Sequence, residues 1–140
     1  MMGQGKTKVA MVEIAGRGGI WHYTLNLCGM LTRLSDLWVY TAKTYESTKD
    51  MDFHTRPVFN RFGTSLKDLI ILVSGLRSEK FDIVHFQMSQ HPEFVFLLLL
   101  LCRLFSKAKT VVTAHNIVDH ENKAWLRPFF YMVYRYCDSV

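Results

Sequence analysis

The chain has 140 residues, of which 49% are hydrophobic, so it is long and apolar enough to fill the core of one domain. Its net charge is +5, but its 17 lysines and arginines are spread along the chain without a basic run. This distribution argues against a nucleic-acid-binding protein. It leaves an anionic membrane surface and a phosphorylated ligand as equally good partners.

The three cysteines, Cys28, Cys102 and Cys137, lie far apart in stretches that read as apolar helices. No CxxC pair and no Cys/His spacing typical of a metal site is present. We therefore expect buried free thiols, no metal ion and a reducing, cytoplasmic compartment. The N-terminus lacks the apolar core of a signal peptide. The longest apolar run, Phe94–Cys102, is far shorter than the roughly 20 residues of a membrane-spanning helix and predicts a buried helix instead.

The stretch Lys8–Leu34 predicts a buried strand, a glycine loop and a helix. Residues Val9–Val12 are apolar without alternation, which is typical of a central strand covered on both faces of a parallel sheet. Glycines crowd into Ala15–Ile20, where they allow positive φ angles and close approach of a ligand to the backbone. A helix start at such a loop attracts phosphate through its free N–H groups, so this loop is the first candidate site. The apolar stripe of the helix is expected to be Trp21, Leu25, Cys28 and Leu31.

Strands and helices alternate along the rest of the chain, which predicts right-handed βαβ units and a Rossmann-like parallel sheet with helices on both faces. Residues 1–7 are expected to be disordered and residues 8–140 to form one domain. A sixth strand is expected to begin at Asp138–Val140, which suggests the N-terminal part of a longer protein. The other expected strands are Leu37–Thr41, Pro57–Phe62, Phe81–Phe86 and Thr110–Thr113, and the other expected helices are Ser65–Lys80, Glu93–Phe105 and Lys123–Cys137.

Local signals refine two of these elements. Pro57 cannot donate to a hydrogen-bond ladder, so its strand is expected at an edge of the sheet. In the helix Ser65–Lys80, either Thr64 or Ser65 can cap the N-terminus, and Asp68 suits the first turn. The expected buried stripe of this helix is Leu66, Leu69, Ile70, Val73 and Leu76.

Polar residues gather after three of the expected strands, in Ala15–His22, His85–His91 and Thr113–Glu121. The first and fourth strands of a Rossmann-like sheet flank its topological switch point, where ligands bind beyond the carboxyl ends of the strands. We therefore expect these three segments to converge on one crevice.

Two histidines in these segments are the main candidates for chemistry. His115, followed by Asn116, opens the polar loop after the fifth strand, and we favour a role in a site over a solvated turn. His85 is explained equally well as a core residue and as a site residue. In the glycine loop, Arg17 suits a phosphate contact as well as plain exposure, and His22 lies close to it in sequence.

Three other kinds of site do not match in detail. A nicotinamide site is not expected, because Trp21 stands where the third glycine of GxGxxG belongs and no acidic residue ends the second strand. A nucleophilic triad is not expected either, because the chain has no GxSxG elbow. The segment Asp119–Glu121 offers three metal-ligating side chains, but adjacent residues rarely converge on one ion.

A family resemblance rests on the opening strand with GRGGIWHYTLNL, then FDIVHFQ, then TVVTAHNIVDHE, and an aromatic helix before SV. In this order and spacing, the chain resembles the N-terminal domain of family-four glycosyltransferases, the retaining enzymes of the GT-B fold, over about Lys8–Val140. The resemblance implies transfer of a sugar from a nucleotide-diphosphate sugar to an acceptor. It places this domain on the acceptor side, with the donor held by a second Rossmann-like domain that the chain does not contain.

By position, the resemblance implies that Gly18 and Gly19 approach the donor diphosphate and that His115 is the catalytic residue, in contact with the transferred sugar. No cofactor is implied, because the nucleotide-diphosphate sugar is a substrate. No carboxylate is placed convincingly as a covalent nucleophile. The resemblance implies instead a same-face mechanism in which the leaving phosphate helps to deprotonate the acceptor. The remaining residues of the cleft are expected to be His85 and Gln87 on the acceptor side, together with Arg17, His22 and Asn116.

The helices Glu93–Phe105 and Lys123–Cys137 carry more apolar and aromatic surface than one core face needs, with basic residues among them. This mixture suits a peripheral contact with the inner face of a membrane, as a lipid-linked acceptor or polysaccharide precursor would require. It suits contact with a second domain equally well. The competing function is a non-catalytic Rossmann-like module that binds a protein partner or a membrane surface.

Overall fold

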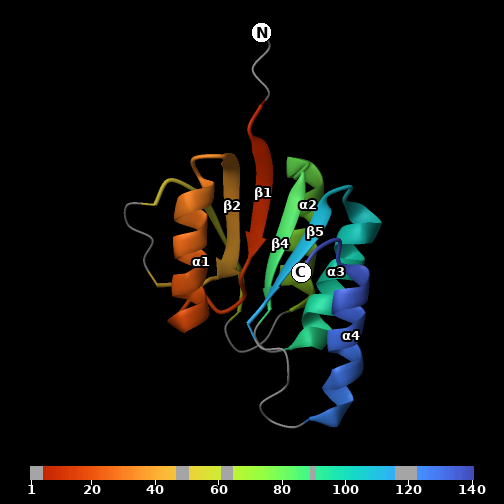
Figure 1. The fold of residues 1–140 in the computed structure, drawn as a ribbon. Coiled ribbons are helices and arrows are strands. Elements are labelled where there is room, and N and C mark those ends of the chain that lie inside the picture. Colours follow the sequence, from red (N-terminus) through yellow and green to blue (C-terminus); the bar gives the residue numbers. More distant parts are fainter. Residues whose placement is uncertain (1–4, 47–50, 61–64, 89–90, 116–122) are drawn as a thin grey trace.

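A computed structural model describes residues 5–46, 51–60, 65–88, 91–115 and 123–140. Its five strands form one parallel sheet in the order β3-β2-β1-β4-β5, which confirms the expected Rossmann-like α/β fold (Figure 1). The strands are β1 Thr7–Val12, β2 Ser35–Ala42, β3 His54–Phe59, β4 Ile83–Met88 and β5 Lys109–Ala114, and the helices are α1 Gly18–Leu31, α2 Leu66–Glu79, α3 Pro92–Phe105, η1 Ala124–Leu126 and α4 Arg127–Tyr136.

The strand β1 lies at the centre of the sheet, as its apolar sequence predicts. It pairs with β2 on one side, where Val9 lies opposite Leu37, and with β4 on the other, where Val9 lies opposite Ile83. All four residues from Val9 to Val12 are buried. Strands β2 and β3 thus follow on one side of β1, and strands β4 and β5 lie on its other side. The strand order reverses between β1 and β4, and the carboxyl ends of these two strands flank the topological switch point.

Two hydrophobic cores cover the two faces of the sheet. On one face, α1 buries Trp21, Leu25 and Cys28 against residues of β1 and β2. On the other face, α2, α3 and α4 pack over the whole sheet (Figure 1). Helices thus cover both faces, as expected, but the two layers differ in extent.

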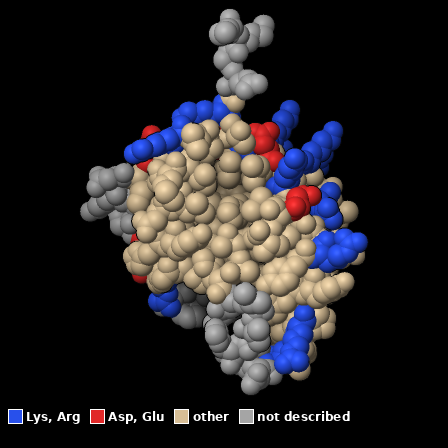
Figure 2. Space-filling model, in the orientation of Figure 1, with Lys and Arg blue, Asp and Glu red and all other residues tan. Residues whose placement is uncertain are grey.

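The half of the sheet formed by β4 and β5 is less covered on the α1 side. There, Ile83, Val111 and Thr113 are only half-buried, whereas Val84 and Val112 on the opposite side are buried. In Figure 2 the charged side chains lie mainly around the rim of the face in view, and its centre is uncharged. Side chains on this part of the sheet are therefore accessible to a ligand or to another part of a protein.

The boundaries of two strands differ from the sequence prediction. β3 is an edge strand, as Pro57 requires, but it runs over His54–Phe59 rather than Pro57–Phe62. β4 begins at Ile83, two residues later than expected, although the backbone of Asp82 already bonds to Lys8 and Lys109 on the two neighbouring strands. The predicted end of this strand at Phe86 is also wrong, since Gln87 and Met88 belong to β4.

The helix α2 has the predicted N-terminus but not the predicted buried stripe. Ser65 and Asp68 form a reciprocal capping box. Leu66 and Ile70 are exposed, however, and Leu72 is buried in their place. The reason is Asp68, which is fully buried and binds Lys43 and Asn60 with hydrogen bonds of 2.9 Å each. These bonds turn a polar residue toward the sheet, which an apolar stripe cannot predict.

The C-terminal elements agree with the sequence. Pro128 lies in the first turn of α4, the one part of a helix that tolerates proline. Ser139 forms an isolated parallel bridge with Val111, as expected for the start of a sixth strand. Of the cysteines, Cys28 and Cys102 are buried and Cys137 is half-buried, and all three are free thiols. In the parts of the chain that the structure covers, no helix has the length and hydropathy to cross a membrane.

Candidate active site at the carboxyl edge of the sheet

The three glycines of the loop between β1 and α1 differ in whether the fold requires them. Gly16 and Gly18 have positive φ angles of 67° and 74°. A Cβ atom at Gly16 would also lie 2.7 Å from the Cβ of Tyr45, so this glycine is required by packing. Gly19 has neither constraint, because a Cβ there would meet no atom within 4 Å. The fold itself therefore does not demand glycine at position 19, and the space above it is open.

A buried carboxylate, Glu13, holds this loop. Its side chain accepts hydrogen bonds from the amides of Ala15 at 3.0 Å and Gly16 at 2.6 Å, and from the hydroxyl of Thr41 at 3.3 Å. Burial raises the pKa of Glu13, and the three hydrogen bonds partly offset that effect. Sequence reasoning missed this residue, although a charged residue that ends a buried apolar strand was a signal.

Replacing Glu13 with leucine should lower the free energy of unfolding by about 1–3 kcal/mol, because the buried amide of Gly16 loses its acceptor. Urea unfolding followed by circular dichroism measures this change. The matched control is Glu46→Leu, an exposed carboxylate at the same loop, which should change stability by about 0.5 kcal/mol at most. Equal stability of Glu13→Leu and the wild type would contradict this role.

Four polar side chains form a connected network on the α1 side of the sheet: two from β4, one from β5 and that of His115, directly after β5. The Nε2 atom of His115 lies 2.7 Å from Oε1 of Gln87, and Nε2 of Gln87 lies 3.5 Å from Nε2 of His85. The Nε2 atom of His85 also lies 2.8 Å from the hydroxyl oxygen of Thr113. The structure thus joins three of the predicted site residues, His85, Gln87 and His115, through direct contacts.

Burial keeps both histidines of this network neutral near pH 7. Burial, together with a smaller effect of the neighbouring His115, lowers the pKa of His85 to about 4. Desolvation also lowers the pKa of His115 below its usual value. Because neutral imidazole has one donor and one acceptor nitrogen, the network can be read as a directed chain of hydrogen bonds.

The first turns of α1 reach the same network. The ring of Tyr23 packs edge-on against the ring of His115, with their centroids 4.9 Å apart. Tyr23 is about one turn beyond Gly19 in α1, so this contact brings the start of the helix beside the end of β5. Two of the three segments predicted to converge meet through Gln87 and His115, and Tyr23, the residue that follows the predicted segment Ala15–His22, contacts His115.

The other predicted residues of the cleft are less tightly connected. His22 is exposed, and its Nε2 atom lies 3.2 Å from the carboxylate of Glu46. The same carboxylate lies 3.4 Å from the amide of Gly18, at the start of α1. Arg17 is exposed at the N-cap position of α1. Asn116, predicted beside His115, lies outside the described residues. Glu46 is a second residue that sequence reasoning missed.

The site offers hydrogen-bonding groups rather than metal ligands. Across the described residues, no three histidine, cysteine or carboxylate side chains are grouped so that they could hold a metal ion. What the site can do is bind hydroxyl groups through neutral imidazole and amide side chains, and bind an anion through backbone N–H groups of the glycine loop.

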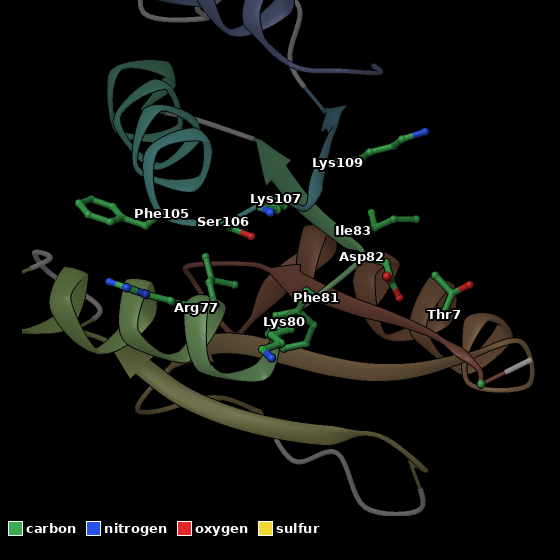
Figure 3. Close-up of a pocket in the computed structure, with 12 residues that line it drawn as sticks. Thr7, Arg77, Lys80, Phe81, Asp82, Ile83, Phe105, Ser106, Lys107 and Lys109 are labelled. Carbon is green, nitrogen blue, oxygen red and sulfur yellow. The ribbon is translucent and has the colours of Figure 1, made fainter.

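A broad groove of about 1050 Å³ lies at the opposite, amino edge of the sheet. Figure 3 shows its lining, which includes Arg77, Lys80 and Lys107. Arg77 lies in the last turn of α2, Lys80 caps that helix, and Lys107 follows the end of α3. Cations at helix C-termini complement the helix dipole, so these charges are explained by the helix ends. The groove is separate from the histidine network.

Comparison with known proteins agrees with the geometry. A model of the family described as Glycosyltransferase Family 4 matches residues 17–140, a span that begins within the glycine loop and includes β4, β5 and α4. No curated protein matches the chain. The family match covers most of the chain and confirms the resemblance in its sequence: this chain belongs to glycosyltransferase family 4 and is a glycosyltransferase-type domain.

Proposed function

We propose that these residues form the acceptor-side domain of a retaining glycosyltransferase, which transfers a sugar from a nucleotide-diphosphate sugar to a hydroxyl group of an acceptor. A second domain holds the donor and completes the cleft. The observation that carries this proposal is the His115 network at the carboxyl edge of the sheet, beside the helix that the glycine loop begins. Ligands of open α/β sheets bind at this edge.

The glycine loop supplies what the departing group needs. When the sugar–phosphate bond breaks, negative charge builds up on the nucleotide diphosphate. Backbone N–H groups at the start of a helix stabilise such charge without a metal ion. In this proposal the diphosphate displaces the Glu46 carboxylate from the amide of Gly18, and the open space at Gly19 admits it.

The carboxylates near the loop are already engaged. Glu13 is buried under the amides of Ala15 and Gly16, and Glu46 pairs with His22. Neither is placed as a free nucleophile for a covalent sugar intermediate. This favours a same-face transfer in which the leaving phosphate takes the proton of the acceptor hydroxyl, while the network around His85 and Gln87 contacts the acceptor.

The test is a transfer assay on the complete enzyme with a panel of nucleotide-diphosphate sugars and acceptors. We expect turnover with at least one donor, and a product whose anomeric proton coupling in NMR matches that of the donor. The 140-residue chain alone should show no turnover, because it supplies half of the cleft. Inversion of the anomeric centre would refute the retaining mechanism. Absence of turnover with every donor would leave the non-catalytic binding module.

We further propose that the acceptor is lipid-linked and that α4 contacts the membrane surface. Trp125 and Tyr131 are 59% and 69% exposed, and the exposed Arg127 and Arg135 lie on the same helical segment. Exposed aromatic side chains with basic neighbours suit the interface of an anionic membrane. Contact of this surface with the second domain is the other outcome of the test below.

The complete protein should sediment with vesicles that contain anionic lipid and less with neutral vesicles. An aromatic side chain that enters the interface contributes about 1.5–3 kcal/mol to binding. The double variant Trp125→Ser/Tyr131→Ser should therefore bind the anionic vesicles at least roughly tenfold more weakly than the wild type. The control is Leu66→Ser on α2, which is also exposed and should bind like the wild type. Equal recovery of the wild type in the supernatant with both kinds of vesicle would remove the membrane proposal.

A further inference from the structure

We propose that Gln87 is a positioning residue that holds His115 in one neutral tautomer, with the proton on Nε2 and the lone pair on Nδ1, and that Met11 fixes the orientation of the Gln87 amide. The role of this tautomer in sugar binding rests on the proposed function. The tautomer itself rests only on the contacts of five side chains.

The first contact fixes the donor nitrogen of His115. Oε1 of Gln87 lies 2.7 Å from Nε2 of His115, and Gln87 is 5% exposed, so water does not compete for this oxygen. An amide oxygen only accepts hydrogen bonds. The Nε2 atom of His115 must therefore donate, which leaves Nδ1 as the acceptor of the neutral ring.

This argument holds only if the amide of Gln87 cannot turn over, and Met11 prevents that. The Nε2 atom of Gln87 lies 3.2 Å from the Sδ atom of Met11, which is fully buried in the central strand. A thioether sulfur is a weak acceptor and has no hydrogen to donate. The amide nitrogen donates to it, whereas a turned amide would press its oxygen lone pairs against the sulfur.

The far end of the network agrees with this orientation. His85 accepts at Nε2 from the amide of Gln87 at 3.5 Å and from the hydroxyl of Thr113 at 2.8 Å, so its own proton lies on Nδ1. If the oxygen and nitrogen of the Gln87 amide were exchanged, every donor and acceptor in the hydrogen-bond network would reverse, and the sulfur of Met11 would face an oxygen. The sulfur therefore selects one of two otherwise self-consistent arrangements.

The consequence for ligand binding is a defined polarity. With its proton directed at Gln87, His115 presents Nδ1 as a hydrogen-bond acceptor, so the group it recognises is a hydroxyl donor such as that of a sugar. His85 on β4 and Tyr23 on α1 are the titratable groups that contact the His115 region among the described residues, and neither is a carboxylate. The imidazole is thus held neutral by its surroundings.

The test is two-bond ¹H–¹⁵N correlation NMR of the histidine rings in ¹⁵N-labelled protein, with His115 assigned from the spectrum of a His115→Gln variant. The chain has six histidines, so the signals are separable. We expect a protonated shift at Nε2 of His115 and an unprotonated shift at Nδ1 at pH 7. A proton on Nδ1 of His115 would overturn the proposal.

Two variants test the parts played by Gln87 and Met11. Gln87→Glu keeps an acceptor but adds a charge, so the pKa of His115 in an NMR titration should rise by about one to three units. Met11→Leu removes the sulfur, so the His115 signals should shift toward a mixture of tautomers. Met88→Leu, on the opposite face of β4 and equally buried, is the matched control and should leave them unchanged.

An unchanged pKa in Gln87→Glu, or an unchanged tautomer in Met11→Leu, would contradict these roles. In the complete enzyme, Gln87→Glu should also move the acid limb of kcat/KM to higher pH, because His115 becomes protonated sooner on acidification. The NMR results do not depend on turnover. A correct tautomer in an enzyme that does not need His115 would therefore refute the proposed function while the assignment of Gln87 stands.

Discussion

Replacing His115 with alanine should lower kcat/KM of the complete enzyme by roughly two orders of magnitude or more, the scale for loss of one positioned polar contact at a transition state. His115 lies at the end of β5, held by Gln87 at 2.7 Å and by the ring of Tyr23. No other imidazole among the described residues has this combination of position and support. Steady-state kinetics with the donor identified by the transfer assay measures the loss.

The control is His54→Ala, which removes an exposed histidine where β3 begins, at the opposite edge of the sheet. It should leave kcat/KM near the wild-type value. Each variant must first show an unchanged melting temperature and circular dichroism. A folded His115→Ala enzyme with near-normal kcat/KM would refute the site assignment, even though the fold and the family would stand.

The pH dependence follows from the neutral form of His115. Desolvation lowers the pKa of His115. The ring is therefore neutral at pH 7 and becomes protonated only below the usual pKa of a histidine side chain. Because the neutral ring is the active form, kcat/KM should fall as the pH drops through this lowered pKa. His115→Ala should lack this acid limb. A limb that persists in the variant would belong to another group.

The fold could be predicted from the sequence because its main signals are local. The unbroken apolar run Val9–Val12 predicts a central strand, and Pro57 predicts an edge strand. Ser65 and Asp68 predict where α2 begins, because a capping box depends on neighbours three residues apart. These features need no knowledge of which elements meet in space.

Contacts between distant elements could not be predicted in the same way. Asp68 faces the core because Lys43 and Asn60, both far from it in sequence, supply its partners. The sequence predicts a strand that ends at Phe86, whereas β4 continues through the buried side chain of Gln87 to Met88. Its amide is satisfied by Met11 on β1 and by His115 directly after β5, which only the sheet order brings beside it.

The second large effect is expected at Gly19. Gly19→Val should lower kcat/KM by roughly two orders of magnitude, because the added side chain blocks the approach of the diphosphate to the N–H groups at the start of α1. The loss should appear mainly as weaker donor binding. Calorimetric titration of the complete enzyme with the nucleotide diphosphate measures the binding, and Gly19→Ala should give a smaller loss in the same direction.

This prediction separates binding from folding because the neighbouring glycine behaves differently. A Cβ at Gly19 meets no atom within 4 Å, and alanine is a better helix former than glycine, so the variants at this position should melt no lower than the wild type. Gly16→Ala should instead lower the melting temperature, because its Cβ would lie 2.7 Å from that of Tyr45 at a positive φ angle. A Gly19→Val enzyme that folds and binds the nucleotide diphosphate normally would show that the diphosphate does not approach this loop. A Gly19→Val chain that unfolds would show instead that the open space at this position is needed by the fold.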